Sequence, residues 1–200
     1  SRGNRDRDFY SAQLRFDNNS EDAESFLILQ QSERKSNDKA IDESTFIHGR
    51  YILVGAEAVH WELFAQYSEN PFRNYKKRSV LGGGLRYELS KSARLGAGIL
   101  NEDETELTGR SKTTERFGFY LHNSIELAEN IVLKPTIYFQ PSIDDFENDY
   151  KASIILALDF KVNENFKITM QYSSFRDSDP PMLAEKTDES ISTMFSYNLN

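Results

Sequence analysis

Apolar and polar residues alternate one by one through almost the whole chain, and this period of two restricts the chain to β-strands. In the segment 59–67, for example, the odd positions are Val, Trp, Leu, Ala and Tyr, and the even positions are His, Glu, Phe and Gln. Successive side chains of a strand point to opposite faces, so such a segment has one apolar face and one polar face. No segment sustains the spacing of an amphipathic helix for long. The pattern therefore predicts an all-β chain.

Eleven runs of this kind are readable, many of about 10–14 residues, which exceeds the usual strand length of about 5–6. They lie near residues 8–16, 24–32, 43–54, 58–68, 78–89, 93–101, 114–127, 131–140, 149–162, 166–176 and 189–199.

Short turns and longer polar segments alternate between these runs. The short turns recur about every 36 residues, the length of two strands with two connections, and this rhythm continues through residues 1–200, which predicts a single domain. The short turns lie near Asn18–Asp22, Gly55–Glu57, Ser90–Ser92, Ala128–Asn130 and Asn163–Asn165. The longer polar segments are Ser32–Asp42, Ser68–Lys77, Asn101–Thr113, Pro141–Asn148 and Asp177–Asp188.

The long runs and the two kinds of connection predict an antiparallel up-and-down transmembrane β-barrel of about 12 strands. A tilted strand needs about 9–11 residues to cross a bilayer, and bacterial outer-membrane barrels have short turns on one side and longer loops on the other. Such barrels have an even number of strands. We therefore expect a twelfth strand, which either precedes Ser1 or is hidden within the eleven readable runs.

Composition excludes several other classes of protein. The net charge of -8 argues against a nucleic-acid-binding protein, and the absence of cysteine excludes disulfides, thiolate zinc sites and a cysteine nucleophile. No segment approaches the roughly 20 apolar residues of a membrane-spanning helix. A mean hydropathy of -0.64 with 12% aromatic residues fits a barrel with polar loops, a polar interior and aromatic girdles. The alternative is a soluble periplasmic ligand-binding barrel, whose outer face would be polar.

The segment 64–87 resembles a bacterial family. In that family an aromatic strand ends in a loop that contains Phe-Arg, and the next strand reads Arg-x-x-x-Gly-x-Gly-Leu-x-Tyr. The matching residues are Phe72, Arg73, Arg78, Gly82, Gly84, Leu85 and Tyr87. The segment is similar to the salt-stress-induced outer-membrane proteins, a domain of unknown function. The resemblance implies an outer-membrane β-barrel, and it supplies no catalytic residue and no cofactor.

Charged residues of both signs fall on the polar faces of the runs, where a barrel would turn them toward its lumen. They would either crosslink into a closed interior or line a narrow water-filled path. The candidates for lining the lumen are Arg50, Glu62, Arg86, Glu88, Arg94, Arg116, Lys134, Asp159 and Lys161.

Three further motifs resemble catalytic, phosphate-binding or calcium-binding sites, but none has the complete pattern of such a site. His122 and Ser124 would share a face of one strand, as in a membrane-facing lipid hydrolase, but no third residue is placed to orient the histidine. The glycines of 82–84 lack the Lys-Ser/Thr ending of a phosphate loop and instead predict bends or close backbone approach. The acidic clusters lack the spacing of a calcium loop, so we expect solvated loops and no metal site. These clusters are Asp17–Asp22, Glu102–Glu106, Asp144–Asp149 and Asp177–Asp179.

The sequence thus predicts a non-enzymatic protein of the bacterial outer membrane with a structural, envelope-stress or narrow-pore role. The expected partners are outer-membrane lipid and lipopolysaccharide, with Arg73, Lys76, Lys77 and Arg78 as candidates for contacting lipid phosphates. Phe195 and Tyr197 resemble the aromatic ending that the barrel-assembly machinery reads, although the chain closes with Leu199 and Asn200. No nucleic-acid partner is expected, and the pattern leaves the oligomeric state open.

Overall fold

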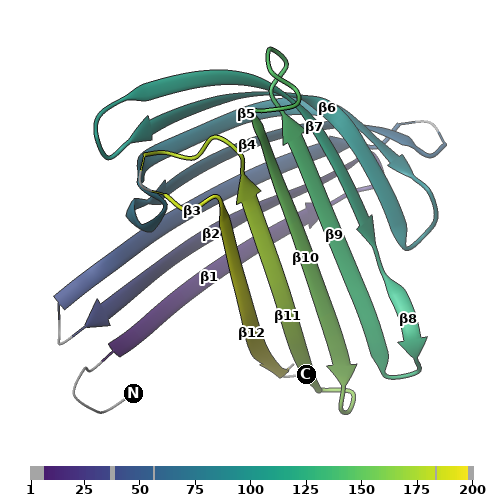
Figure 1. Cartoon of the computed structure of the whole chain (residues 1–200). Coiled ribbons are helices and arrows are strands. Elements are labelled where there is room, and N and C mark those ends of the chain that lie inside the picture. The colour runs from purple at the N-terminus through teal and green to yellow at the C-terminus, as the bar shows by residue number, and fades with distance from the viewer. Residues whose placement is uncertain (1–6, 37–38, 56, 183, 198–200) are drawn as a thin grey trace. The chain divides into compact units, whose positions relative to one another are not determined.

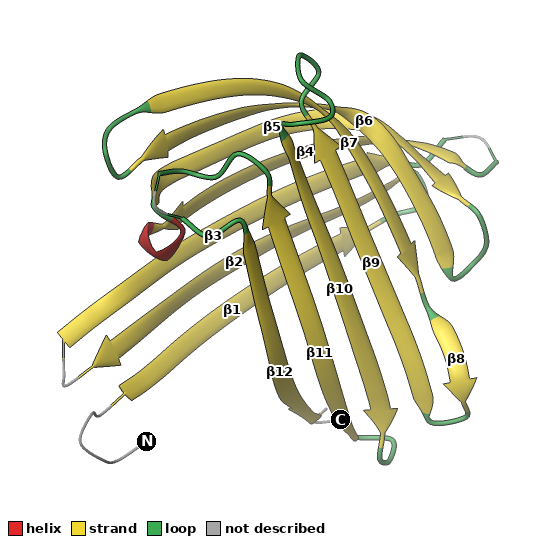
Figure 2. Ribbon diagram, in the orientation of Figure 1, coloured by secondary structure: helices red, strands yellow, loops and turns green. Residues whose placement is uncertain are grey.

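A computed structural model describes residues 7–36, 39–55, 57–182 and 184–197, and most of them lie in β-strands (Figure 1). The strands are β1 (Arg7–Asn19), β2 (Ala23–Ser36), β3 (Lys39–Leu53), β4 (Val59–Asn70), β5 (Tyr75–Glu88), β6 (Ala93–Glu106), β7 (Ser111–Asn123), β8 (Ile125–Ala128), β9 (Ile131–Pro141), β10 (Tyr150–Lys161), β11 (Phe166–Asp177) and β12 (Thr187–Tyr197). Figure 2 shows one short 3-10 helix, η1 (Pro71–Arg73), among them. Within the described part of the chain, no helix has the length and apolar character needed to cross a membrane.

The strands follow one another in an antiparallel meander. The order is β1-β2-β3-β4-β5-β6-β7-β9-β10-β11-β12, and β8 pairs with β9 beside this path. Among the described residues the order begins at β1 and ends at β12 without a pairing between these two strands. The predicted all-β antiparallel architecture is confirmed, whereas closure into a barrel stays a prediction.

The structure has twelve strands among the described residues, as predicted, because one of the eleven readable runs contains two strands. The predicted run 114–127 is divided into β7 and β8 at Ser124, whose backbone N–H donates to the carbonyl of Ser92. This division supplies the twelfth strand. A strand before Ser1 stays a prediction, and Leu199 and Asn200 lie outside the described residues.

Three of the expected long connections are wrong. Most of Ser68–Lys77 is strand, because β4 extends to Asn70 and β5 begins at Tyr75, so only residues 71–74 join them. Most of Ser32–Asp42 is strand, because β2 extends to Ser36 and β3 begins at Lys39. Most of Asn101–Thr113 is also strand, and only residues 107–110 join β6 to β7. Hydrogen bonds between strands join backbone N–H and C=O groups whether the side chains are polar or apolar. These strands therefore continue beyond their apolar segments. The connections 142–149 and 178–186 are long, as predicted.

The chain forms two compact units, which are described separately below. Unit 1 comprises Ser1–Leu85, Gly98–Arg116 and Pro180–Glu185. Unit 2 comprises Arg86–Ala97, Phe117–Asp179 and Lys186–Asn200. The single domain inferred from the rhythm of the turns stays a prediction.

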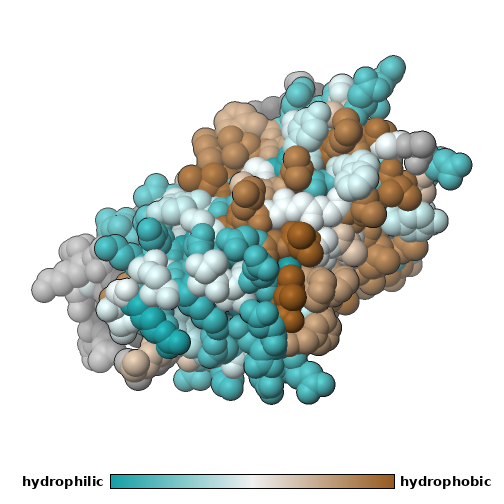
Figure 3. Space-filling view, turned by 90° about the horizontal axis from the view of Figure 1, so that it is seen from above, coloured by the Kyte–Doolittle hydropathy of each residue, from teal (hydrophilic) through white to brown (hydrophobic). Residues whose placement is uncertain are grey.

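The strands bury polar residues and expose apolar ones. In the described part of the chain, four hydrophobic residues are buried against fourteen polar or charged ones. Large apolar side chains such as Leu63 (64% exposed) and Phe195 (70% exposed) reach the surface, and Figure 3 shows hydrophobic residues gathered in patches there. This distribution is the reverse of the one expected for a soluble barrel.

Glycines on the polar face make room for aromatic rings on a neighbouring strand. In unit 1 a Cβ at Gly82 would lie 2.4 Å from the ring of Phe64, and in unit 2 a Cβ at Gly96 would lie 1.9 Å from the ring of Tyr120. A Cβ at Gly98 would lie 2.3 Å from the carbonyl oxygen of Gly83, which confirms the close backbone approach expected of these glycines.

Candidate functional site

All nine residues proposed to line a lumen lie on the polar face of their strands. On β4, for example, Glu62 is buried, while its neighbours Trp61 and Leu63 on the opposite face are more than half exposed. The nine differ in burial: Glu62, Arg86, Arg116 and Asp159 are buried, and Lys161 is exposed. Whether this face borders a lumen stays a prediction.

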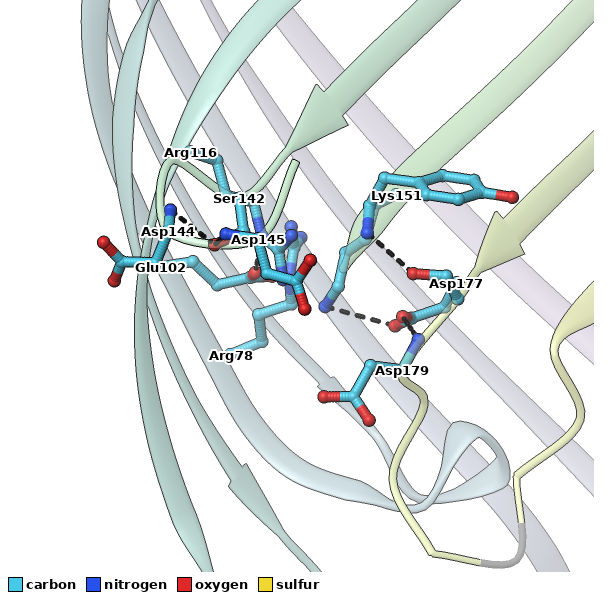
Figure 4. A network of polar contacts seen from close by, with 11 residues as sticks. Arg78, Glu102, Arg116, Ser142, Asp144, Asp145, Lys151, Asp177 and Asp179 are labelled. Carbon is cyan, nitrogen blue, oxygen red and sulfur yellow. Dashed lines mark hydrogen bonds and ion pairs between the residues drawn. The ribbon is translucent and has the colours of Figure 1, made fainter. Parts of the chain in front are cut away.

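In unit 1 a single buried carboxylate holds two arginines from neighbouring strands. Glu102 of β6 accepts hydrogen bonds from Arg78 of β5 and from Nε of Arg116 of β7, the latter at 2.6 Å (Figure 4). The side chains of Glu102 and Arg116 are 3% and 2% exposed, and that of Arg78 is 16% exposed. Charged groups removed from water in this way are stable only as a set.

The sequence identified Arg116 in this cluster, but it placed Glu102 in a solvated acidic loop and Arg78 among the residues that contact lipid phosphates. Both expectations are wrong, because Arg78 lies in β5 and pairs with Glu102. Glu102 is in phase with Gly98 and Leu100 of β6, so strand pairing carries it onto the buried face. The continuing alternation was the signal that could have identified it.

A second pair in unit 1 lies among aromatic rings. Nη1 of Arg50 is 3.3 Å from Oε2 of Glu62, and its guanidinium lies 5.3 Å from the ring centroid of Phe64 and 6.0 Å from that of Phe26. The buried ring of His48 packs 5.2 Å from the ring of Phe26. Arg50 lies opposite Phe64 in register and Glu62 lies opposite Ile52, so the ion pair between Arg50 and Glu62 runs diagonally between β3 and β4.

His60 has a local structural role. Its Nδ1 accepts a hydrogen bond from the backbone N–H of Gly55 at 3.1 Å, which closes the connection between β3 and β4.

Unit 2 contains a similar shared carboxylate, Asp159 of β10. Its Oδ2 lies 2.8 Å from Nζ of Lys134 on β9 and 3.2 Å from Nζ of Lys167 on β11, and its Oδ1 accepts a hydrogen bond from Thr169 at 2.6 Å. Asp159 is buried, but the two lysine side chains remain 40% and 43% exposed. The ammonium groups therefore remain accessible to solvent.

Glu88 of β5 is shared in the same way. One of its oxygens lies 2.7 Å from Nε of Arg86, and the other lies 3.4 Å from Nε of Arg94 on β6. Arg86 is buried, whereas the side chain of Arg94 is 41% exposed. Five of the predicted residues of unit 2 thus belong to two clusters that each join two cations to one carboxylate.

A buried pair near the long connections of unit 2 was missed. Nζ of Lys151 lies 3.3 Å from Oδ2 of Asp177, and both side chains are less than a tenth exposed (Figure 4). Asp177 was expected in a solvated loop, and this expectation is wrong because β11 extends to Asp177, opposite Lys151 in register. Register between strands is not contained in the alternation of either strand.

His122 and Ser124, which the sequence placed on one strand, are separated by the end of β7. Nδ1 of His122 lies 2.9 Å from the hydroxyl of Thr136, while Ser124 falls in the break between β7 and β8. No cluster of three acidic or histidine residues that could hold a metal ion occurs in the part of the chain that the structure describes.

Solved structures of outer-membrane proteins share this fold. The NanC porin has a TM-score of 0.56 and 10% sequence identity, and the match covers 98% of this chain and 97% of the porin. The translocator domain of the autotransporter NalP from Neisseria meningitidis has a TM-score of 0.55 and 10% identity, and the match covers 100% of this chain and 83% of that domain. Identity this low shows the fold alone, that of the outer-membrane β-barrels.

Comparison of sequences adds a family. A family model described as "Protein of unknown function, DUF481" matches residues 1–199. No curated protein sequence matches the chain significantly.

Proposed function

The chain belongs to the DUF481 family of proteins of unknown function, and from its fold and its polar face we propose that it forms a narrow pore in the bacterial outer membrane. One observation carries the proposal: charged residues are gathered on one face of the strands and apolar residues on the other. A barrel in lipid requires this sorting, because its outer face contacts hydrocarbon and its inner face contacts water.

The apolar face supplies the contact with lipid. Tyr51, Trp61, Tyr87 and Tyr197 are between 47% and 62% exposed on this face, and such amphipathic rings are favoured at the two membrane interfaces. Outer-membrane lipid and lipopolysaccharide are therefore the proposed surroundings. The barrel-assembly machinery is the proposed partner during insertion, through the aromatic residues of β12.

The polar face supplies the path for solutes. In this proposal the clusters centred on Glu88 and Asp159 reduce the width of the path. The exposed parts of Arg94, Lys134 and Lys167 contact the water inside it. A narrow path lined by charged side chains admits small polar solutes and excludes large ones.

Two measurements test this function. The protein is expected in the outer-membrane fraction, soluble only in detergent, and the purified protein is expected to produce discrete conductance steps in planar bilayers. Recovery from the soluble periplasm without detergent would contradict the membrane location. Insertion without conductance steps would contradict the pore.

The buried cluster of Arg78, Glu102 and Arg116 favours a second candidate, a closed barrel with a structural role under envelope or salt stress. A closed barrel would insert into bilayers, remain silent at all voltages, and protect cells during growth at high salt. A deletion strain that grows normally at high salt would contradict the stress role.

A further inference from the structure

Five cationic side chains gather on the polar face of unit 2, toward the short turns. Arg86 lies at the end of β5 and Arg94 at the start of β6, and both contact Glu88. Lys134 and Lys167 flank Asp159, and Lys161 lies opposite Lys167 in register. We call these five residues the basic patch.

Carboxylates on the same strands do not balance this charge. Glu88 and Asp159 are each shared by two cations of the patch. Glu126 of β8 faces the same side, because it is opposite Val132, which in turn is opposite Asp159. On these strands, five cations against three carboxylates leave two positive charges in excess. The short turns that join the strands add Lys91, Glu129 and Glu164, which reduces the excess to one, in a chain whose net charge is -8.

The patch also keeps donors available to a solute. The side chains of Arg94, Lys134 and Lys167 are each about two-fifths exposed, and Lys161 is exposed without an ion pair in the described residues. An ammonium has three N–H donors and a guanidinium has five, so one shared carboxylate leaves donors free to bind another anion.

We propose that the basic patch binds small anions and makes the pore selective for them. The inference rests on the proposed pore function and names its class of solute: chloride, or small molecules that bear a carboxylate or phosphate. Excess positive charge along a low-dielectric wall raises the local concentration of anions and lowers that of cations. Charge-assisted hydrogen bonds from the exposed donors then hold the anion in transit.

The reversal potential across a planar bilayer with a KCl gradient measures this selectivity. The wild-type protein is expected to pass Cl⁻ better than K⁺. The variant Lys161→Gln is expected to lower the Cl⁻/K⁺ permeability ratio roughly twofold, because one uncompensated charge at close range changes ion occupancy by this order. Lys161 has no carboxylate partner to leave behind, so this variant should fold normally. Adding Lys134→Gln and Lys167→Gln leaves more carboxylates than cations on this face and should bring the ratio below one.

The matched control is Lys76→Gln with Lys77→Gln, which removes exposed lysines of unit 1 near the long connections and should leave the ratio unchanged. Folding of each variant is checked by the gel shift between unheated and heated samples. Conductance steps that favour K⁺ or show no preference would overturn the inference. An unchanged permeability ratio in folded Lys161→Gln would do the same. Neither result would contradict the proposed pore function. Absence of any steps would overturn the pore and the inference with it.

Discussion

Each unit contains a carboxylate shared by two cations, and the two arrangements differ in burial. Glu102 of unit 1 binds two arginines whose side chains are at most 16% exposed, whereas Asp159 of unit 2 binds two lysines that remain at least 40% exposed. Removing one partner from a buried set leaves charge without compensation, while solvent replaces a lost partner in an exposed set. The comparison indicates that the Glu102 cluster holds strands together and that the Asp159 cluster is available to solutes.

The largest effect is expected from Glu102→Gln. It leaves the buried Arg78 and Arg116 facing a neutral amide and should lower the free energy of unfolding by about 3–5 kcal/mol. Urea titration in lipid vesicles, followed by the fluorescence of the single tryptophan Trp61, measures this loss. The control is Glu115→Gln, an exposed neighbour on β7, for which we expect little change. A loss below about 1 kcal/mol would show that the cluster stabilises the protein no more than a surface ion pair does.

The next effect concerns packing and should be equal in the two units. Gly82→Ala and Gly96→Ala each force a methyl group against an aromatic ring, with an expected cost of about 1–3 kcal/mol. Gly49→Ala is the control, because a Cβ at this position would lie 4.0 Å from the side chain of Leu27, which is an ordinary van der Waals contact. Similar losses at Gly82 and Gly96 would show that the units differ in charge burial rather than in the packing of glycine against aromatic rings. A large loss in one unit alone would contradict that view.

A smaller effect is expected from Asp159→Asn. The exposed ammonium groups of Lys134 and Lys167 can turn to water, so the expected loss is about 1 kcal/mol in the same urea titration. Thr169→Val serves as a companion variant that removes one hydrogen bond to Asp159 and keeps its charge. A loss for Asp159→Asn as large as that for Glu102→Gln would remove the proposed distinction between the clusters.

The smallest effect is the response to salt. Raising the ionic strength from about 0.1 M to about 1 M shortens the screening length from about 10 Å to about 3 Å. The cost of Asp159→Asn should therefore shrink by a few tenths of a kcal/mol, while that of Glu102→Gln stays constant because its partners are shielded from ions. Equal salt dependence of the two costs, measured by urea titration at both ionic strengths, would show that solvent reaches both clusters alike.

The alternation of the sequence determined the strands, their two faces and the residues on each. Because side chains of a strand point to opposite faces in turn, the phase of Trp61 and Leu63 was sufficient to assign Glu62 to the polar face, and the same reasoning assigned Arg94 and Lys134. The glycines of 82–84 likewise predicted a close approach between backbones, which the structure shows at Gly98.

Only the tertiary structure decided which charges meet and how deeply they are buried. Arg78, Glu102 and Arg116 come from three strands, and their contact depends on the register between neighbours, about which the pattern within one strand is silent. The same holds for Lys151 with Asp177. The extension of β2 and β6 beyond their apolar segments is likewise decided by backbone pairing between strands, since peptide hydrogen bonds form regardless of side-chain polarity.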